Sequence, residues 1–329
     1  MREIRNKLEA LLDDNSTERD ILAALNSLKI DSLRMPARKK GVPTLWEYFA
    51  DVDGLSPAMR KLRLGAYNCI HDLSGDDIDW ADVDSAFFFE LKKKMSKAKL
   101  SLNTQANYAG VLKSVMKDGF RLKYHDCTDY EDFRIRRELP DTIYLTEEEL
   151  QMLWDVHLES DTERKARDLF LLGVYTAARY SDCVNFSKRN IVGDKFRYTQ
   201  KKTGQSVIMP LSPKVKLLLK RNGGAAPQLA LPNYDRAIKS AAMRAGITTP
   251  TETTRTIGTR HKTQSAPKCD FIGSHTARRT GCTLLYKSGV PLKVCMYLSG
   301  HTSESNFLRY IRITKEEGAD MLAKLDFFK

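Results

Sequence analysis

Residues 275–310 read HTARRTGCTLLYKSGVPLKVCMYLSGHTSESNFLRY, and this stretch determines how the second half of the chain is interpreted. His275 and Arg278 are three residues apart, so they share one face of the helix that the spacing predicts. The tripeptide Ser-Gly-His ends at His301, and Tyr310 follows nine residues later. The stretch therefore places two imidazoles, a guanidinium and a phenol in one mostly helical segment.

Further basic groups precede this stretch. Arg179 lies in Thr-Ala-Ala-Arg-Tyr-Ser-Asp, which ends at Asp182 and follows an apolar helix. Lys201 and Lys202 open a Lys-Lys-Thr-Gly turn between two segments that alternate in strand fashion, 196–199 and 206–211. The sequence thus orders an arginine, a hairpin lysine, a His-Arg pair, a histidine and a tyrosine along more than 130 residues.

These residue types suit the transfer of a DNA phosphodiester to a protein hydroxyl. Attack on the phosphorus builds negative charge on the non-bridging oxygens, which two guanidiniums can bind in fork geometry. A phenol can be the nucleophile and then forms a covalent phosphotyrosine. A lysine can protonate the departing 5′-oxygen, and a histidine can accept the phenol proton or hydrogen-bond the phosphate. Because arginines supply the positive charge, the set needs no metal and no other cofactor.

The second half of the chain resembles the catalytic domain of the tyrosine recombinase, or phage integrase, family. Arg179 matches the first arginine of the family's Thr-Gly-apolar-Arg-x-Ser-Glu motif. Asp182 matches the acidic residue that helps to orient this arginine, and Lys202 matches the hairpin lysine that resembles a general acid. A salt bridge between Arg179 and Asp182 is the purely structural alternative for this pair.

The remaining matches lie in the stretch quoted first. His275 and Arg278 match the family's His-x-x-Arg motif, His301 matches Leu-Gly-His, and Tyr310 matches the nucleophile. The resemblance covers 43–320, because the basic helical segment 43–123 is similar to the family's core-binding domain, which clamps the opposite side of the duplex. The expected fold is mainly α with a small β-sheet: a two-domain DNA clamp of a helical core-binding domain and an α+β catalytic domain.

The chain departs from the family pattern at four positions. Ala177 and Ala178 replace the usual Gly and a bulky apolar residue before Arg179, and Asp182 is shorter than the commoner Glu. Ser299 replaces an apolar residue before Gly-His, and this form resembles integrases of Bacteroides-type mobile elements. None of the four changes removes a reacting group.

Several residues compete for the same roles. Tyr286 and Tyr297 are rival nucleophiles by type, although the apolar neighbours of Tyr297 predict a place in the core. Arg279 adjoins Arg278, and only one of the two can share the face of His275. Lys201 remains an alternative to Lys202 as the general acid.

Charge favours a polyanionic partner. The 329 residues hold 54 Lys and Arg against 42 Asp and Glu, a net charge of +12. Residues 141–329 hold 30 basic and 19 acidic side chains, whereas 1–140 hold 24 and 23. No secretory signal follows Met1, no apolar run reaches the length of a membrane span, and the six cysteines have no CxxC spacing. We expect a cytoplasmic, nucleoid-associated protein of bacterial or phage origin.

The patterning along the chain predicts four parts. Residues 1–42 form an appendage and linker, 43–125 a helical DNA-binding domain, 126–140 a second linker, and 141–329 the catalytic domain. Capping boxes at Thr44 and Thr146 mark two helix starts. Residues 248–268, which are polar and Thr-rich, predict a loop or an irregular hairpin.

One stretch of the first domain has a segregated charge. Between 92 and 123 a single acid, Asp118, faces nine basic residues. Such a face suits contact with the phosphate backbone, although a solvated helix face is the alternative. The expected DNA-binding residues are Lys92, Lys93, Lys94, Lys97, Lys99, Lys113, Lys117 and Arg121.

The resemblance implies a site-specific recombinase that joins Tyr310 to a 3′-phosphate. Its partner is double-stranded DNA with a specific recombination site, bound by a homotetramer that is a monomer when free. A type IB topoisomerase shares the chemistry and is one rival; a catalytically silent DNA-binding protein is another. The apolar tail 321–328 can dock on a neighbouring subunit or on its own domain.

Overall fold

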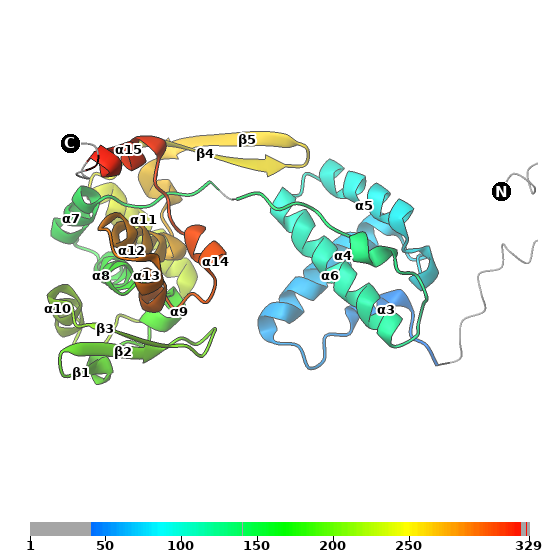
Figure 1. Cartoon of the computed structure of the whole chain (residues 1–329), viewed down its shortest axis with the longest axis horizontal. Coiled ribbons are helices and arrows are strands. Elements are labelled where there is room, and N and C mark those ends of the chain that lie inside the picture. Colours follow the sequence, from blue (N-terminus) through cyan, green and yellow to red (C-terminus); the bar gives the residue numbers. More distant parts are fainter. Residues whose placement is uncertain (1–40, 140, 324–326, 328–329) are drawn as a thin grey trace, which may run out of the picture. The chain divides into compact units, whose positions relative to one another are not determined.

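Helices dominate the part of the chain that the computed structural model describes, which is residues 41–139, 141–323 and 327. The chain divides into two units at the bond between Arg137 and Glu138, and each unit has its own apolar core (Figure 1). The mainly α architecture with small sheets agrees with the fold class predicted from the sequence. The expected appendage 1–42 lies almost wholly outside the described residues.

The described part of the first unit contains four helices and two short 3-10 helices. Their bounds are α3 (Leu45–Ala50), α4 (Pro57–Ser74), η2 (Trp80–Asp82), α5 (Ser85–Lys97), α6 (Leu102–Arg121) and η3 (Asp129–Asp132). The capping box predicted at Thr44 is formed with Glu47. Trp80 packs so closely on α6 that a Cβ at Gly119 would lie 2.4 Å from its ring, so this crossing requires glycine.

The chain after α6 continues into the same core. Tyr130 and Phe133 are buried, and the ring of Phe133 stacks on that of Phe88 with centroids 4.4 Å apart. Ile135 packs against the same cluster. These three residues fall within the linker expected at 126–140 and anchor that segment to the first core at three points.

The second unit contains the remaining elements. Its helices are α7 (Glu147–Asp155), α8 (Asp161–Thr176), α9 (Tyr180–Cys183), η4 (Lys188–Asn190), α10 (Pro213–Arg221), α11 (Leu231–Arg244), η5 (Lys268–Phe271), α12 (Ser274–Lys287), α13 (Leu292–Ser299), α14 (Glu304–Leu308) and α15 (Lys315–Ala323). The capping box predicted at Thr146 is present. Helix α8 is the apolar centre, and α10, α11 and α12 contact it (Figure 1).

The crossing of α8 and α12 is unusually close. A Cβ at Gly281 would lie 2.2 Å from the carbonyl oxygen of Val174, so only glycine fits there. This contact fixes α12 next to the end of α8. Because Arg179 follows α8 and Arg278 lies on α12, the crossing brings the two arginine motifs together.

A three-stranded antiparallel sheet stands beside these helices. Its strands are β1 (Ile191–Val192), β2 (Lys195–Thr199) and β3 (Ser206–Pro210), in the order β1-β2-β3. Phe196 and Tyr198 face the core and pair with Met209 and Val207, as the predicted alternation requires. The turn between β2 and β3 carries Lys202.

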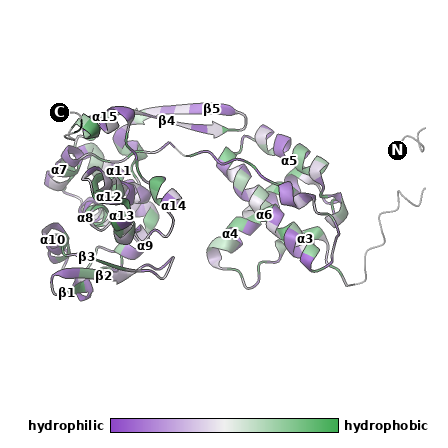
Figure 2. Cartoon of the chain, viewed as in Figure 1, coloured by the Kyte–Doolittle hydropathy of each residue, from purple (hydrophilic) through white to green (hydrophobic). Residues whose placement is uncertain are grey.

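Residues 250–267 form a regular two-stranded ribbon, β4 (Pro250–Ile257) and β5 (Arg260–Pro267), instead of a loop or an irregular hairpin. The ribbon is largely hydrophilic (Figure 2). The edge of β4 donates backbone hydrogen bonds from Thr254 to Asp141 and from Thr256 to Glu138. Two carboxylates thus tie the entry of the second unit to the ribbon.

The C-terminal helices pack on the same unit. Glu317 of α15 pairs with Lys287 of α12 at 2.9 Å and accepts a hydrogen bond from Tyr144. These contacts hold α15 on its own domain, while half of the tail 321–328 lies outside the described residues. Over the described ranges, none of the helices combines the length and apolar character of a bilayer span.

Candidate active site

Arg278 is the most deeply buried charge of the second unit, with no exposed surface. Its Nη1 donates to the carbonyl oxygen of Ala177 at 2.9 Å, and its Nη2 donates to that of Ser299 at 2.7 Å. The same Nη2 lies 3.1 Å from Nε2 of His301. This fully buried guanidinium is held by two carbonyls and pairs with no carboxylate among the described residues, so its positive charge is left for another anion.

Arg179 lies at the start of α9 and points toward the same place. Its Nη1 donates to Oε1 of Gln200 at 2.7 Å. Burial lowers the pKa of Arg179, and the neighbouring charge of Arg278 lowers it further. Two guanidiniums that repel each other in a partly buried site are stabilised when an anion such as phosphate binds between them.

The backbone conformation before Arg179 shows what one departure from the family pattern costs. Ala177 has a φ of 49° and a ψ of 21°, in the left-handed region, and its side chain is fully buried. Glycine enters this region without strain, whereas a residue with a Cβ pays about 1–2 kcal/mol. The left-handed conformation is what lets α8 end and Arg179 turn into the site.

Asp182 has a different contact from the one that the sequence suggested. Its Oδ1 accepts a hydrogen bond from the backbone N–H of Lys201 at 2.9 Å. The ion pairs among the described residues do not join it to Arg179, whose hydrogen bond goes to Gln200. The buried carboxylate therefore holds the lysine hairpin, whereas the side chain that hydrogen-bonds to Arg179 is Gln200.

Tyr310 follows the short helix α14 and is tethered at its backbone. Thr283 of α12 donates to its carbonyl oxygen at 3.1 Å, and Phe307, fully buried, anchors the helix before it. The Tyr310 ring lies 5.4 Å from Cζ of Arg278 and 4.9 Å from the His301 ring. The phenol hydroxyl makes no hydrogen bond to any residue within the described ranges.

His301 is oriented by its neighbours and held neutral. Its Nδ1 lies 2.8 Å from Oγ of Ser299, so the serine that distinguishes this chain fixes the ring. Burial lowers its pKa to about 3, with added repulsion from Arg278 and Arg179. A neutral imidazole can accept a hydrogen bond at one ring nitrogen and donate one from the other.

His275 and Lys202 stand at the open side of this cluster. Desolvation lowers the pKa of His275, and the charges of Arg279, Arg278, Arg179 and Lys202 lower it further. Lys202 is exposed on its hairpin, and its charge is one of those that lower the pKa of His275.

The rival residues have other contacts. Arg279 donates from Nη1 to the carbonyl oxygen of Ile143, whereas the donors of Arg278 go to Ala177 and Ser299. Tyr297, which the sequence placed in the core, is 71% exposed. Helix α13 has apolar side chains on every face, so its periodicity could not tell the buried Cys295 and Met296 from the exposed Tyr297.

The expected DNA-binding residues of the first unit fall into two groups. Lys93 pairs with Glu90, Lys94 and Lys113 donate to backbone carbonyls, and Arg121 pairs with Asp118. The side chains of the others make no hydrogen bond or ion pair with the described residues: Lys92, Lys97, Lys99 and Lys117. Lys99 has a φ of 58°, a strained backbone for a residue other than glycine.

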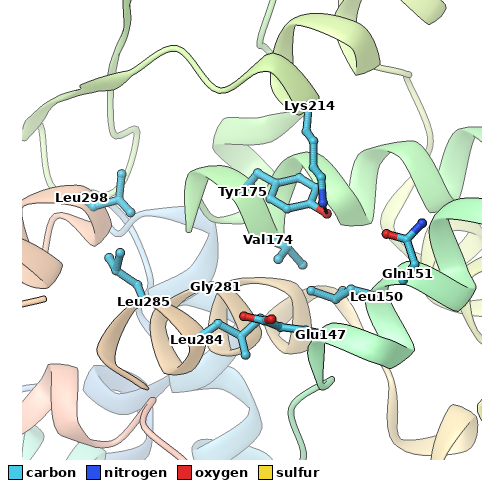
Figure 3. Close-up of a pocket in the computed structure, with 10 residues that line it drawn as sticks. All are labelled: Glu147, Leu150, Gln151, Val174, Tyr175, Lys214, Gly281, Leu284, Leu285 and Leu298. Atoms are coloured by element: carbon cyan, nitrogen blue, oxygen red, sulfur yellow. Dashed lines mark hydrogen bonds between the residues drawn. The ribbon is translucent and has the colours of Figure 1, made fainter. Parts of the chain in front are cut away.

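A separate pocket of about 450 Å³ opens between α7, α8, α12 and α13 (Figure 3). Leucines line one side, and Tyr175 and Lys214 line the other, with Nζ of Lys214 3.1 Å from the Tyr175 hydroxyl. The charged and catalytic candidates Arg179, Arg278, His301 and Tyr310 do not line this pocket. It is therefore distinct from the candidate active site.

The depressed pKa of His301 makes the stability of the protein sensitive to acid. The imidazole takes up a proton at about pH 6.5 when unfolded but only at about pH 3 when folded, so acid favours the unfolded chain between these values. We expect the free energy of unfolding to fall less from pH 7 to pH 5 in His301→Gln than in the original chain. Urea titrations at both pH values measure the free energy of unfolding. An equal fall of this free energy in the variant and in the original chain would contradict the prediction.

Comparison with known proteins agrees with this geometry. A model of the phage integrase family matches residues 144–317. The integrase of Escherichia phage P2 is 28% identical over 109 residues, which is 32% of this chain and 31% of that relative. The match thus spans about a third of the relative's length.

Two kinds of solved structure share the fold. A lambda integrase tetramer bound to a Holliday junction has a TM-score of 0.65 at 15% identity, covering 91% of this chain and 87% of that one. The Tn1549 transposon integrase in complex with circular intermediate DNA has a TM-score of 0.59 at 15% identity, covering 85% and 99%. Since the family model spans more than half of the sequence, this chain belongs to the phage integrase family of tyrosine recombinases.

Proposed function

We propose that this chain is an integrase that breaks and rejoins DNA at a specific site, with Tyr310 as the nucleophile. The observation that carries the proposal is the convergence of Arg278 and His301 on the Tyr310 ring, at 5.4 and 4.9 Å, with Arg179 held beside them. A metal-free phosphoryl transfer needs such a set of cations around a hydroxyl nucleophile.

The reaction follows from these groups. The Tyr310 oxygen bonds to phosphorus as the bond to the 5′-oxygen breaks, and Arg179 and Arg278 hold the non-bridging oxygens. The phenol proton passes to a neutral histidine, for which His275 and His301 are the candidates, and Lys202 protonates the leaving 5′-oxygen. A 5′-hydroxyl of the partner duplex then attacks the phosphotyrosine and frees Tyr310. The covalent bond conserves the phosphodiester energy, so the cycle consumes no ATP.

Two duplexes with two exchanged strands each require four tyrosines. We therefore infer a homotetramer on DNA that forms from free monomers, the stoichiometry that the lambda integrase structure has on its junction. Residues 141–329 would carry the chemistry and 43–125 would bind DNA. The Ser-Gly-His form at Ser299 supports a mobile element of the Bacteroides type, whose integrase would act in the bacterial cytoplasm on nucleoid DNA.

Strand exchange tests the proposal. Duplexes that the protein selects from a random pool supply its site, and two of them, of different length and one labelled, are incubated with the protein in EDTA without ATP. We expect labelled products of a new length. Relaxation of a supercoiled plasmid with no exchange of ends would indicate a topoisomerase instead, and binding without cleavage would indicate a silent DNA-binding protein.

The unpaired lysines of the first unit predict a specific salt dependence. Each lysine that neutralises a phosphate contributes about 0.9 to the slope of log affinity against log salt. Lys97→Ala with Lys117→Ala should lower the slope by about 2, alike for the selected site and for unrelated DNA. Lys93→Ala, whose ammonium already pairs with Glu90 at 2.7 Å, is the matched control and should change it less. Fluorescence anisotropy over a salt series measures the slopes; a loss confined to the selected site would contradict backbone contact.

A further inference from the structure

Gln200 is a buried polar side chain at the end of the β2 strand, only 1% exposed, that no part of the reaction above uses. Its Oε1 accepts from Nη1 of Arg179 at 2.7 Å and from Oγ1 of Thr203 at 2.8 Å. Its Nε2 donates to the carbonyl oxygen of Ser299 at 2.8 Å. Since arginine can only donate and a carbonyl can only accept, one orientation of the amide satisfies both ends.

These bonds join three separate segments of the site. The Ser299 carbonyl oxygen that accepts from Gln200 also accepts from Nη2 of Arg278 at 2.7 Å. Through this shared acceptor, Gln200 links Arg179 to Arg278 and to the turn that carries His301. Thr203 ties the same amide to the hairpin of Lys202.

The glycine before His301 is matched to this amide. A Cβ at Gly300 would lie 2.2 Å from Nε2 of Gln200, and the φ of 62° already favours glycine there. The turn and the amide therefore fit each other as one unit. Any larger residue at position 300 would displace the side chain that holds Arg179.

We propose that Gln200 is a positioning residue that sets Arg179 relative to Arg278 without neutralising either charge. A carboxylate in its place could also accept from Arg179, but it would offset the positive charge that the scissile phosphate needs and would repel the Ser299 carbonyl oxygen. An amide orients the guanidinium and leaves its charge available. The inference rests on the proposed function, because it assigns Gln200 to the same phosphate site.

The test compares Gln200→Glu and Gln200→Met, which keep the length of the side chain, with the original chain. Gln205→Glu is the matched control, since it adds the same charge to an exposed position of the same hairpin. The measurements are the single-turnover rate of covalent adduct formation on selected, nicked duplexes at saturating protein, the Kd for the intact duplex and the unfolding temperature.

We expect both Gln200 variants to form the adduct about 100-fold more slowly, as a displacement of about 1 Å can cause. Their Kd and unfolding temperature should remain close to those of the Gln205→Glu control. Adduct formation within threefold of the original rate, or a loss that appears in Kd and unfolding temperature instead, would overturn the inference. If the Gln200 variants do not fold, Thr203→Val on the exposed turn takes their place. It should lower the rate of adduct formation several-fold, with Kd and the unfolding temperature close to those of the control.

The outcome separates this inference from the proposed function. If the original chain forms no adduct that depends on Tyr310, the proposed function fails. If that adduct forms and the Gln200 variants keep its rate, only the role of Gln200 fails.

Discussion

Tyr310→Phe should form no covalent DNA adduct, whereas the original chain should become attached to the 3′-phosphate of a nicked duplex. The substitution removes the only atom that can attack phosphorus and little else. The tether from Thr283 reaches the backbone of residue 310, and the ring keeps its contacts with His301 and Arg278. Because the hydroxyl has no hydrogen-bond partner among the described residues, its loss should change the unfolding free energy by less than about 1 kcal/mol.

Denaturing gels of the labelled duplex measure the adduct directly. Tyr297→Phe is the matched control, because Tyr297 is exposed on α13 and the substitution removes the same phenol oxygen from a rival position. It should keep the full yield. An adduct that survives in Tyr310→Phe and disappears in Tyr297→Phe would assign the nucleophile to Tyr297.

Arg278→Lys should lower the rate of adduct formation by about 10²–10³, the loss typical of removing one donor from a developing oxyanion. The guanidinium spans the carbonyl oxygens of Ala177 and Ser299 and still faces the Tyr310 ring. An ammonium is a single point that cannot bridge two carbonyls and present a further donor to phosphate. Stability should fall as well, by about 1–3 kcal/mol, because a buried carbonyl loses its donor.

Arg279→Lys provides the comparison for this prediction. That arginine is adjacent in sequence, and its Nη1 donates to the carbonyl oxygen of Ile143 outside the cluster. Single-turnover rates and urea unfolding of both variants should show a large rate loss only for position 278. A larger loss of rate in Arg279→Lys than in Arg278→Lys would show that Arg279, not Arg278, binds the phosphate.

Sequence patterns that involve only neighbouring residues were sufficient to predict several helix starts and two strands. The capping boxes at Thr44 and Thr146 mark helix starts in the structure, because their side-chain and backbone bonds close within four residues. Helix α10 begins at Pro213, where proline is favoured at a helix start, and its apolar spacing continues to Arg221. The alternation around Phe196 and Tyr198 likewise predicted β2 and β3.

Contacts between distant segments were beyond these rules. Gln200 meets Ser299 across 99 positions, and a single glutamine carries no periodic or motif signal. Asp182 could face either Arg179 or the hairpin, and only the fold places the N–H of Lys201 against it. The ribbon β4–β5 is polar on both faces, so it lacked the alternation that would have predicted two regular strands.

The connection between the two units has a consequence for how the chain searches DNA. Ile135 packs on the first core and Glu138 is anchored to β4, so only Arg136 and Arg137 lie between them. Three peptide steps span at most about 11 Å. Once either unit rests on a duplex, so short a tether keeps the other at an effective concentration in about the millimolar range. Under the proposed function we expect the second unit to engage the same duplex as an intramolecular step, so the whole chain should bind far more tightly than either unit alone.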